Sequence, residues 1–116
     1  MTDREMLELA ARAAGIKGKV INAEGRGAWI PMPGASSAVW NPLDDDGDAL
    51  RLAVKLELIL CVRREGVTDA TMHAPRTGMT PYLSFLEQHK DDPYAATRRA
   101  IVRAAAEIGR QMEDAK

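Results

Sequence analysis

The chain has 116 residues, of which 46% are hydrophobic and 28% charged, and its formal net charge is −1 at pH 7. This length fits one domain with an ordinary hydrophobic core, so we expect a single domain over residues 1–116. The composition excludes a disordered or collagen-like chain. A net charge this close to zero creates no field that would gather nucleic acid or anionic lipid, so we do not expect either as a partner.

Three features predict a cytoplasmic protein. The single cysteine, Cys61, excludes an internal disulfide and favours a reducing compartment. No apolar run approaches the ~18 residues that are needed to cross a bilayer. The polar start, Met1 to Glu5, does not resemble a signal peptide.

The first helix is predicted over Asp3–Ala14. Thr2 and Glu5 have the spacing of a capping box, and Gly15 is placed to end the helix in the left-handed conformation. Its apolar stripe consists of Met6, Leu9, Ala10 and Ala13.

The next segment, Lys17 to Val39, is rich in glycine and proline. Val20–Ala23 and Ala28–Ile30 predict a short, imperfect hairpin, and Pro31–Ser37 predicts an exposed loop. Gly25-Arg26-Gly27 lacks the third glycine and the Lys-Ser/Thr pair of a phosphate-binding loop, so no such loop is expected.

An Asn41-Pro42 turn precedes the second helix, which is predicted over Gly47–Lys55 with Asp45 or Asp46 as its cap. The acidic run Asp44, Asp45, Asp46 and Asp48 raises the alternative of a calcium or magnesium site. An EF-hand register beginning at Asp44 puts Ala49 where glycine is required and Lys55 where the closing glutamate belongs. We therefore expect helix capping and no metal.

Three strands are predicted in an antiparallel meander: Leu56–Arg63, Val67–Ala74 and Thr80–Leu86, with turns at Arg64-Glu65-Gly66 and at Pro75–Gly78. The first is apolar on both faces, which predicts a strand covered on both sides. The second has the polar alternation of a half-exposed strand. The expected fold is α+β, an antiparallel sheet of three to five strands packed with three helices.

The last helix is predicted to start at Pro93, after Asp91 and Asp92. Its apolar stripe consists of Tyr94, Ile101, Ala105, Ile108 and Met112, and its outward row consists of Arg99, Arg103, Glu107 and Arg110. The arginines suggest weak nucleic-acid association as one hypothesis, but Glu107 interrupts them and few aromatic residues are present to stack on bases. A solvated helix face is the favoured interpretation.

No catalytic constellation emerges from the sequence. The only histidines are His73, in a predicted strand, and His89, in a predicted loop. Cys61 lies in the predicted core strand, where a thiol is usually inert. A Cys61–His73 pair across the hairpin is the one combination of side chains that could carry out chemistry, and we expect both residues to have a structural role instead. We therefore predict no catalytic residue, no cofactor and no enzymatic activity.

Two blocks of sequence carry a family resemblance: Trp40-Asn41-Pro42 followed by Asp48-Ala49, and Asp92-Pro93 followed by Ala96-Thr97-Arg98-Arg99-Ala100. They resemble the NinX-like group of small proteins from tailed phages and prophages, described as a phage α-β-α sandwich domain. The resemblance spans Trp40 to Met112. It implies a compact, sandwich-like α+β fold and an accessory role during infection, and it brings no functional residue.

Two functions remain open. The favoured one is a non-enzymatic phage accessory protein that binds a host factor in the bacterial cytoplasm. The alternative is a small-molecule binder that sequesters a nucleotide signal of host defence. Its candidate residues lie near the starts of two helices. Trp40 and Tyr94 would offer a ring for stacking, Asn41 an amide, and Arg98 a cation that pairs with phosphate. In the structural interpretation, Trp40 and Tyr94 instead pack together. The exposed middle strand and the alanine-rich helices permit a homodimer without specifying one.

Overall fold

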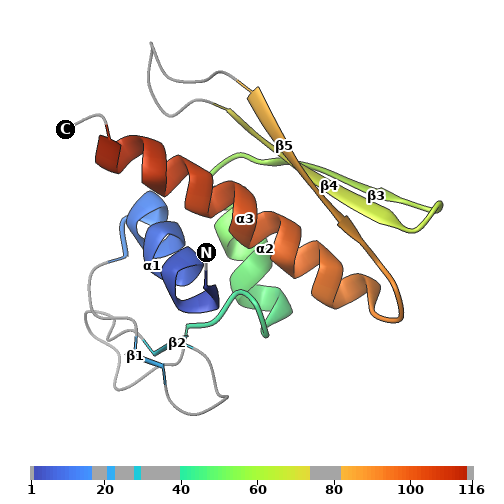
Figure 1. Cartoon of the computed structure of the whole chain (residues 1–116), viewed down its shortest axis with the longest axis horizontal. Coiled ribbons are helices and arrows are strands. Elements are labelled where there is room, and N and C mark those ends of the chain that lie inside the picture. Colours follow the sequence, from blue (N-terminus) through green and yellow to red (C-terminus); the bar gives the residue numbers. More distant parts are fainter. Residues whose placement is uncertain (1, 17–20, 23–27, 30–39, 74–81, 115–116) are drawn as a thin grey trace.

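The computed structural model describes residues 2–16, 21–22, 28–29, 40–73 and 82–114. Its helices are α1 (Asp3–Ala14), α2 (Asp46–Lys55) and α3 (Pro93–Asp114). Its strands are β1 (Ile21–Asn22), β2 (Ala28–Trp29), β3 (Ile59–Arg63), β4 (Val67–His73) and β5 (Tyr82–Gln88). Figure 1 shows the long helix α3 between the sheet of β3 to β5 on one side and helices α1 and α2 on the other.

The helix ends confirm the local predictions. At α1, the Glu5 N–H donates to Thr2 Oγ1 (3.1 Å) and the Thr2 N–H donates to Glu5 Oε1 (3.3 Å), which completes the capping box. The Thr2 hydroxyl also donates to Glu5, and these bonds lower the pKa of that carboxyl. Gly15 ends the helix at φ 73°. Asp45 caps α2, because its carboxylate accepts the Asp48 N–H at 2.8 Å.

The sheet is an antiparallel meander in the order β3-β4-β5, and β1 pairs with β2 separately. The α+β prediction is confirmed, with the main sheet at the low end of the predicted strand count. In the register, Cys61 lies opposite Asp69, and Asp69 opposite Leu86. Gly66 makes the β3–β4 connection at φ 92°. The last strand, β5, extends to Gln88 rather than ending at Leu86 as predicted, and the predicted start at Thr80 lies outside the described residues.

Two hydrophobic clusters share α3 as a common wall. The first lies between the helices and includes Leu7, Ala10, Leu52, Val102 and Ala106. The second lies between α3 and one face of the sheet, the inner face, and it includes Ala70, Met72, Ala100, Ala104 and Ile108. Alanine dominates the buried face of α3, so its neighbours approach closely.

The expectation that β3 is covered on both sides is wrong. Thr68, Ala70 and Met72 of the inner face are fully buried, whereas Ile59 and Cys61, on the opposite side of the sheet, are exposed. The described helices lie on one side of the sheet only (Figure 1). The structure therefore differs from the α-β-α sandwich that the family resemblance implied: helix α3, and not the sheet, is the middle layer.

Three predictions about helix faces also need correction. The buried residues of α1 are Met6, Leu7, Ala10, Ala11 and Ala14, so the stripe is rotated from the predicted one. Tyr94 is 68% exposed and does not join the apolar stripe of α3. Glu107, predicted to face outward, is half-buried, with 16% of its side chain exposed. In each case the packing of the neighbouring elements decides which side chains of the helix are covered.

Several predicted features fall outside the described residues: the loop at Pro31–Ser37, the glycine-rich stretch at Gly25–Gly27 and the turn at Pro75–Gly78. Within the described helices, none is long and apolar enough to cross a membrane.

Candidate functional site

The four residues predicted to hold a nucleotide differ in their exposure to solvent. Trp40 is buried in the cluster between the helices, with 7% exposed, and Asn41 beside it is 5% exposed. The Asn41 N–H donates to Asp48 Oδ2 (3.0 Å), and its side-chain Oδ1 accepts the Leu43 N–H (3.0 Å). Its Nδ2 donates to Asp44 Oδ2 (3.2 Å). Asn41 therefore builds the turn that enters α2, an Asx turn extended by two carboxylates.

Arg98 joins that turn to α3. Its Nε donates to the Leu43 carbonyl at 2.8 Å and its Nη1 donates to Asp46 Oδ1 at 2.6 Å. Only 15% of the Arg98 side chain is exposed. A phosphate at this guanidinium would have to displace Asp46, with which Arg98 forms a charge-assisted bond.

The structure brings together two of the four predicted residues. Asn41 and Arg98 meet at the turn before α2, through Leu43 and the acidic run. Trp40 points into the core, whereas Tyr94 is exposed at the start of α3, so the two rings do not offer one stacking surface. Nucleotide binding by Trp40, Asn41, Tyr94 and Arg98 stays a prediction.

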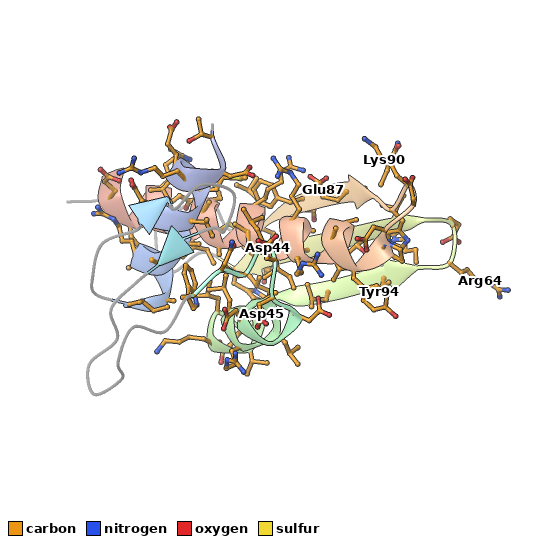
Figure 2. All side chains as sticks on the ribbon, turned by 90° about the horizontal axis from the view of Figure 1, so that it is seen from below. Asp44, Asp45, Arg64, Glu87, Lys90 and Tyr94 are labelled. Atoms are coloured by element: carbon orange, nitrogen blue, oxygen red, sulfur yellow. The ribbon has the colours of Figure 1, made fainter. Side chains whose placement is uncertain are left out.

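The acidic run acts through separate partners. Figure 2 shows Asp44 and Asp45 at the start of α2. Asp44 accepts from Asn41, Asp45 caps the helix, and Asp46 binds Arg98. Asp48 accepts from the Asn41 N–H and pairs with Arg51 at 2.8 Å. In the described part of the chain, no group of three histidine, cysteine or acidic side chains could hold a metal ion.

His89 belongs to a partly buried chain of hydroxyl groups that sequence analysis missed. Thr97 Oγ1 donates to the Pro93 carbonyl (2.8 Å), so it accepts from Thr68 Oγ1, also at 2.8 Å. The Thr68 proton is thereby used, and Thr68 accepts from His89 Nε2 at 2.8 Å. His89 therefore carries a proton on Nε2. The chain ties β4 to the start of α3, and its central hydroxyl group, on Thr68, is fully buried.

Cys61 and His73 do not form a pair. Cys61 lies opposite Asp69, and His73 lies four residues further along β4, opposite Tyr82. That separation is about 13 Å along the strand. The His73 ring instead packs edge-on against Tyr82, with 5.2 Å between ring centroids. Contrary to the prediction of a core position, Cys61 is exposed.

The arginines of α3 are engaged by carboxylates. Arg103 donates to Glu87 at 2.6 Å and lies over the Phe85 ring, 5.3 Å from its centroid. Arg99 pairs with Asp3 at 3.2 Å, and Arg110 binds Glu107. A row of arginines that are already paired offers a nucleic-acid backbone little free positive charge.

The surface that stands out is the outer face of the sheet, opposite the inner face. It presents three large apolar side chains, Ile59 (51% exposed), Tyr82 (64%) and Leu86 (56%). The full outer face, by register, consists of Ile59, Cys61, Arg63, Val67, Asp69, Thr71, His73, Tyr82, Ser84, Leu86 and Gln88.

The polar groups in the middle of the outer face bind one another. Arg63 Nη2 donates to Asp69 Oδ2 at 2.9 Å, and this contact raises the pKa of the Arg63 guanidinium further above its high ordinary value. Thr71 Oγ1 donates to Asp69 Oδ1 (3.1 Å) and accepts from Ser84 Oγ (2.7 Å). The outer face thus combines exposed apolar groups with polar groups that already have partners.

The comparisons with known proteins add no assignment. No protein-family model matches the sequence, and no curated protein matches it. The NinX-like resemblance therefore stays a prediction that rests on the two blocks of sequence quoted above.

Proposed function

We propose that this chain is a non-enzymatic accessory protein of a phage or prophage, that it binds a host protein, and that the outer face of the sheet is the contact surface. The phage setting rests on the sequence resemblance. The contact surface rests on one observation: Ile59, Tyr82 and Leu86 are exposed on a sheet face that no described helix covers.

The chemistry of the outer face favours a protein partner. Covering apolar surface contributes about 25 cal/mol for each Å² removed from water. Covering a polar group without a new bond costs about 1–3 kcal/mol, but Asp69, Thr71 and Ser84 keep their bonds to each other when a partner excludes water. A flat surface with this combination loses little free energy when water is removed from it. Such a surface is better suited to binding another protein surface than to binding a small ligand.

The test uses β5, where Leu86 and Tyr82 lie two strands away from the β3 edge. The variants Leu86→Lys and Tyr82→Lys place a charge on the outer face, and Val54→Lys is the matched control because Val54 is a similarly exposed apolar residue on α2 (69%). The immobilised variants are incubated with lysate of the bacterium that carries the sequence. A captured chain is then purified, and its dissociation constant for each variant is measured.

The expected result is one host chain that binds wild type and Val54→Lys equally, and binds Leu86→Lys and Tyr82→Lys at least about tenfold more weakly, which corresponds to about 1.4 kcal/mol. Circular dichroism and thermal melting establish that all variants are folded. Equal binding by all variants, or no chain retained by wild type, would overturn the proposal.

A further inference from the structure

The two edges of the sheet expose different backbone groups, and the described hydrogen bonds show which ones. The His89 N–H donates to the Gly66 carbonyl at 2.8 Å, so Gly66 and His89 form a bonded pair of the β4–β5 ladder. Bonded and non-bonded pairs alternate in antiparallel sheets. It follows that the backbone N–H and C=O groups of Thr68 bond to β5, whereas those of Val67, Asp69 and Thr71 bond to β3.

The partners of those three residues on β3 are Arg63, Cys61 and Ile59, which therefore direct their backbone groups inward. Leu60 and Val62 direct theirs away from the sheet. On β5 the same alternation directs the backbone of Leu86 outward. A side-chain contact supports this assignment, because the Leu86 carbonyl accepts a hydrogen bond from Arg103 Nη1 at 3.1 Å.

The β5 edge is thus partly blocked by a side chain, whereas no described strand pairs with the outward edge of β3. Within the described residues, no hydrogen bond reaches the outward groups of Leu60 or Val62. Natural proteins protect edge strands with charges, prolines or bulges. The stretch from Ile59 to Val62 has none of these, and both Ile59 (51%) and Val62 (60%) are exposed.

We propose that β3 pairs with β3 of a second copy of this chain, antiparallel and across a two-fold axis at Cys61. Outward backbone groups lie on Leu60 and Val62, so the bonded pairs between the copies must form among these two residues. Centring the pairing on Cys61 sets Leu60 opposite Val62 twice and uses all five residues of β3. The result is a continuous six-stranded sheet, with the outer faces of both copies on the same side.

The side chains suit this register. Val62 packs beside Leu60 of the second copy, on the side of the inner face, and the exposed Ile59 and Cys61 come together on the outer face. Arg63 lies opposite Ile59, with its charge already balanced by Asp69 of its own chain. No like charges oppose each other along β3, and like charges opposite each other destabilise a pair of strands.

The expected dimer is weak. A stable interface buries about 1,200–2,000 Å² in total, and pairing five residues at a strand edge lies below that range. Dimerisation is therefore expected to depend on concentration, with a dissociation constant in the micromolar range or above. The inference is independent of the proposed function, since its measurements report on copies of this chain alone.

Cys61 makes the first test direct, because it is the only cysteine in the sequence. Its pairing with itself is non-hydrogen-bonded, with about 4.5 Å between Cα atoms, within the range that a disulfide spans. Diamide accepts the two electrons and two protons that two thiols release when they form a disulfide. The matched control is the double variant Cys61→Ser, Val54→Cys, which moves the thiol to an exposed position on α2.

Wild type is expected to form a covalent dimer at least about tenfold faster than the control, with a rate that rises with protein concentration. A rate no faster than that of the control overturns the proposed register.

The second test removes one outward donor. Val62→Pro eliminates an N–H that bonds to no other described residue, and a strand edge tolerates proline there. Val62→Thr keeps the N–H and the branched side chain, and it serves as the control. In analytical ultracentrifugation up to about 1 mM, wild type and Val62→Thr should dimerise whereas Val62→Pro stays monomeric. If Val62→Pro does not melt cooperatively, Val62→Lys replaces it. A monomeric wild type, or a dimer that the substitution leaves intact, overturns the proposal.

Discussion

At the scale of single residues, Gly109 shows how the contact between α1 and α3 depends on a missing side chain. A Cβ at Gly109 would overlap the carbonyl group of Leu9, at 2.7 Å from its carbonyl carbon. The obstacle is backbone, so helix α1 as a whole would have to move. A glycine inside a helix usually costs stability, and here it permits the close approach of two alanine-rich helices.

We therefore predict that Gly109→Ala lowers the free energy of unfolding by about 1–3 kcal/mol, even though alanine favours a helix by about 1 kcal/mol. Urea unfolding measures it. Gly47→Ala, in α2, is the control: the atoms nearest to its Cβ belong to the side chains of Arg51 and Asp45, at 3.1 Å or more, and these can move. That variant should be neutral or more stable. A Gly109→Ala protein as stable as wild type would contradict the close approach.

Glu107 carries the second prediction at this scale. Arg110 donates to its carboxylate, Gln111 Nε2 adds a bond at 3.0 Å, and these partners hold the pKa of Glu107 below its ordinary value despite partial burial. A carboxyl whose pKa is lowered by folding stabilises the protein above its unfolded pKa, and the contribution is lost as the pH falls through the folded pKa.

Glu107→Gln should accordingly lower the free energy of unfolding by about 1–2 kcal/mol at pH 7, and the difference from wild type should shrink as the pH falls below the ordinary range of a glutamate carboxyl. Glu8→Gln breaks an exposed pair with Arg4 and should change stability by less than about 1 kcal/mol. Urea unfolding across the pH range measures both. A Glu107→Gln deficit that persists unchanged in acid would rule out the ionised carboxylate as its source.

Elements defined by local chemistry were predictable from the sequence, whereas their surroundings were not. The Thr2–Glu5 capping box, the cap of α2 and the start of α3 at Pro93 depend on residues within one helical turn. The capping box and the start of α3 are confirmed, and of the two caps predicted for α2, Asp45 and Asp46, the structure has Asp45. The apolar residues of β3 identified a strand, but the same pattern suits a covered strand and an exposed edge. Which of the two occurs is decided by α3, which begins thirty residues after β3 ends.

In the candidate site, too, the features set by neighbouring residues were predictable, whereas those set by distant residues were not. Asn41 was correctly placed in a turn, because an Asn-Pro pair has local preferences. The partner that engages Arg98 is Asp46, 52 residues away in the sequence, and no spacing rule connects them. The outer face was also missed, since it is a surface only after β4 and β5 are in register.

The polar chain between β4 and α3 makes a prediction at the scale of elements. Thr68→Val keeps the shape of a fully buried side chain but removes the hydroxyl that His89 and Thr97 share. We expect the free energy of unfolding to fall by about 1–3 kcal/mol, because two polar groups lose a partner. Thr71→Val, on the half-exposed outer face of the same strand, is the control and should change stability by at most about 0.5 kcal/mol. Equal losses for the two variants would show that the polar chain has no special contribution.

At the scale of the whole molecule, α3 is the element on which the arrangement depends. The cluster between the helices contains Val102 and Ala106, and the cluster against the sheet contains Ala104 and Ile108, so successive residues of one helix serve two cores. Neither core is complete without it. The two clusters should therefore be lost together on unfolding, as a single cooperative unit.

This position of α3 also bears on synthesis, because it is the last of the described elements to be translated. While the ribosome is still adding residues, at about 5–20 each second, α1, α2 and the sheet emerge before the helix that covers them. Leu7, Leu52 and Met72, all buried in the finished protein, remain accessible to water and to chaperones during that interval. Both hydrophobic clusters of the described residues therefore stay incomplete in the nascent chain until α3 has been synthesised.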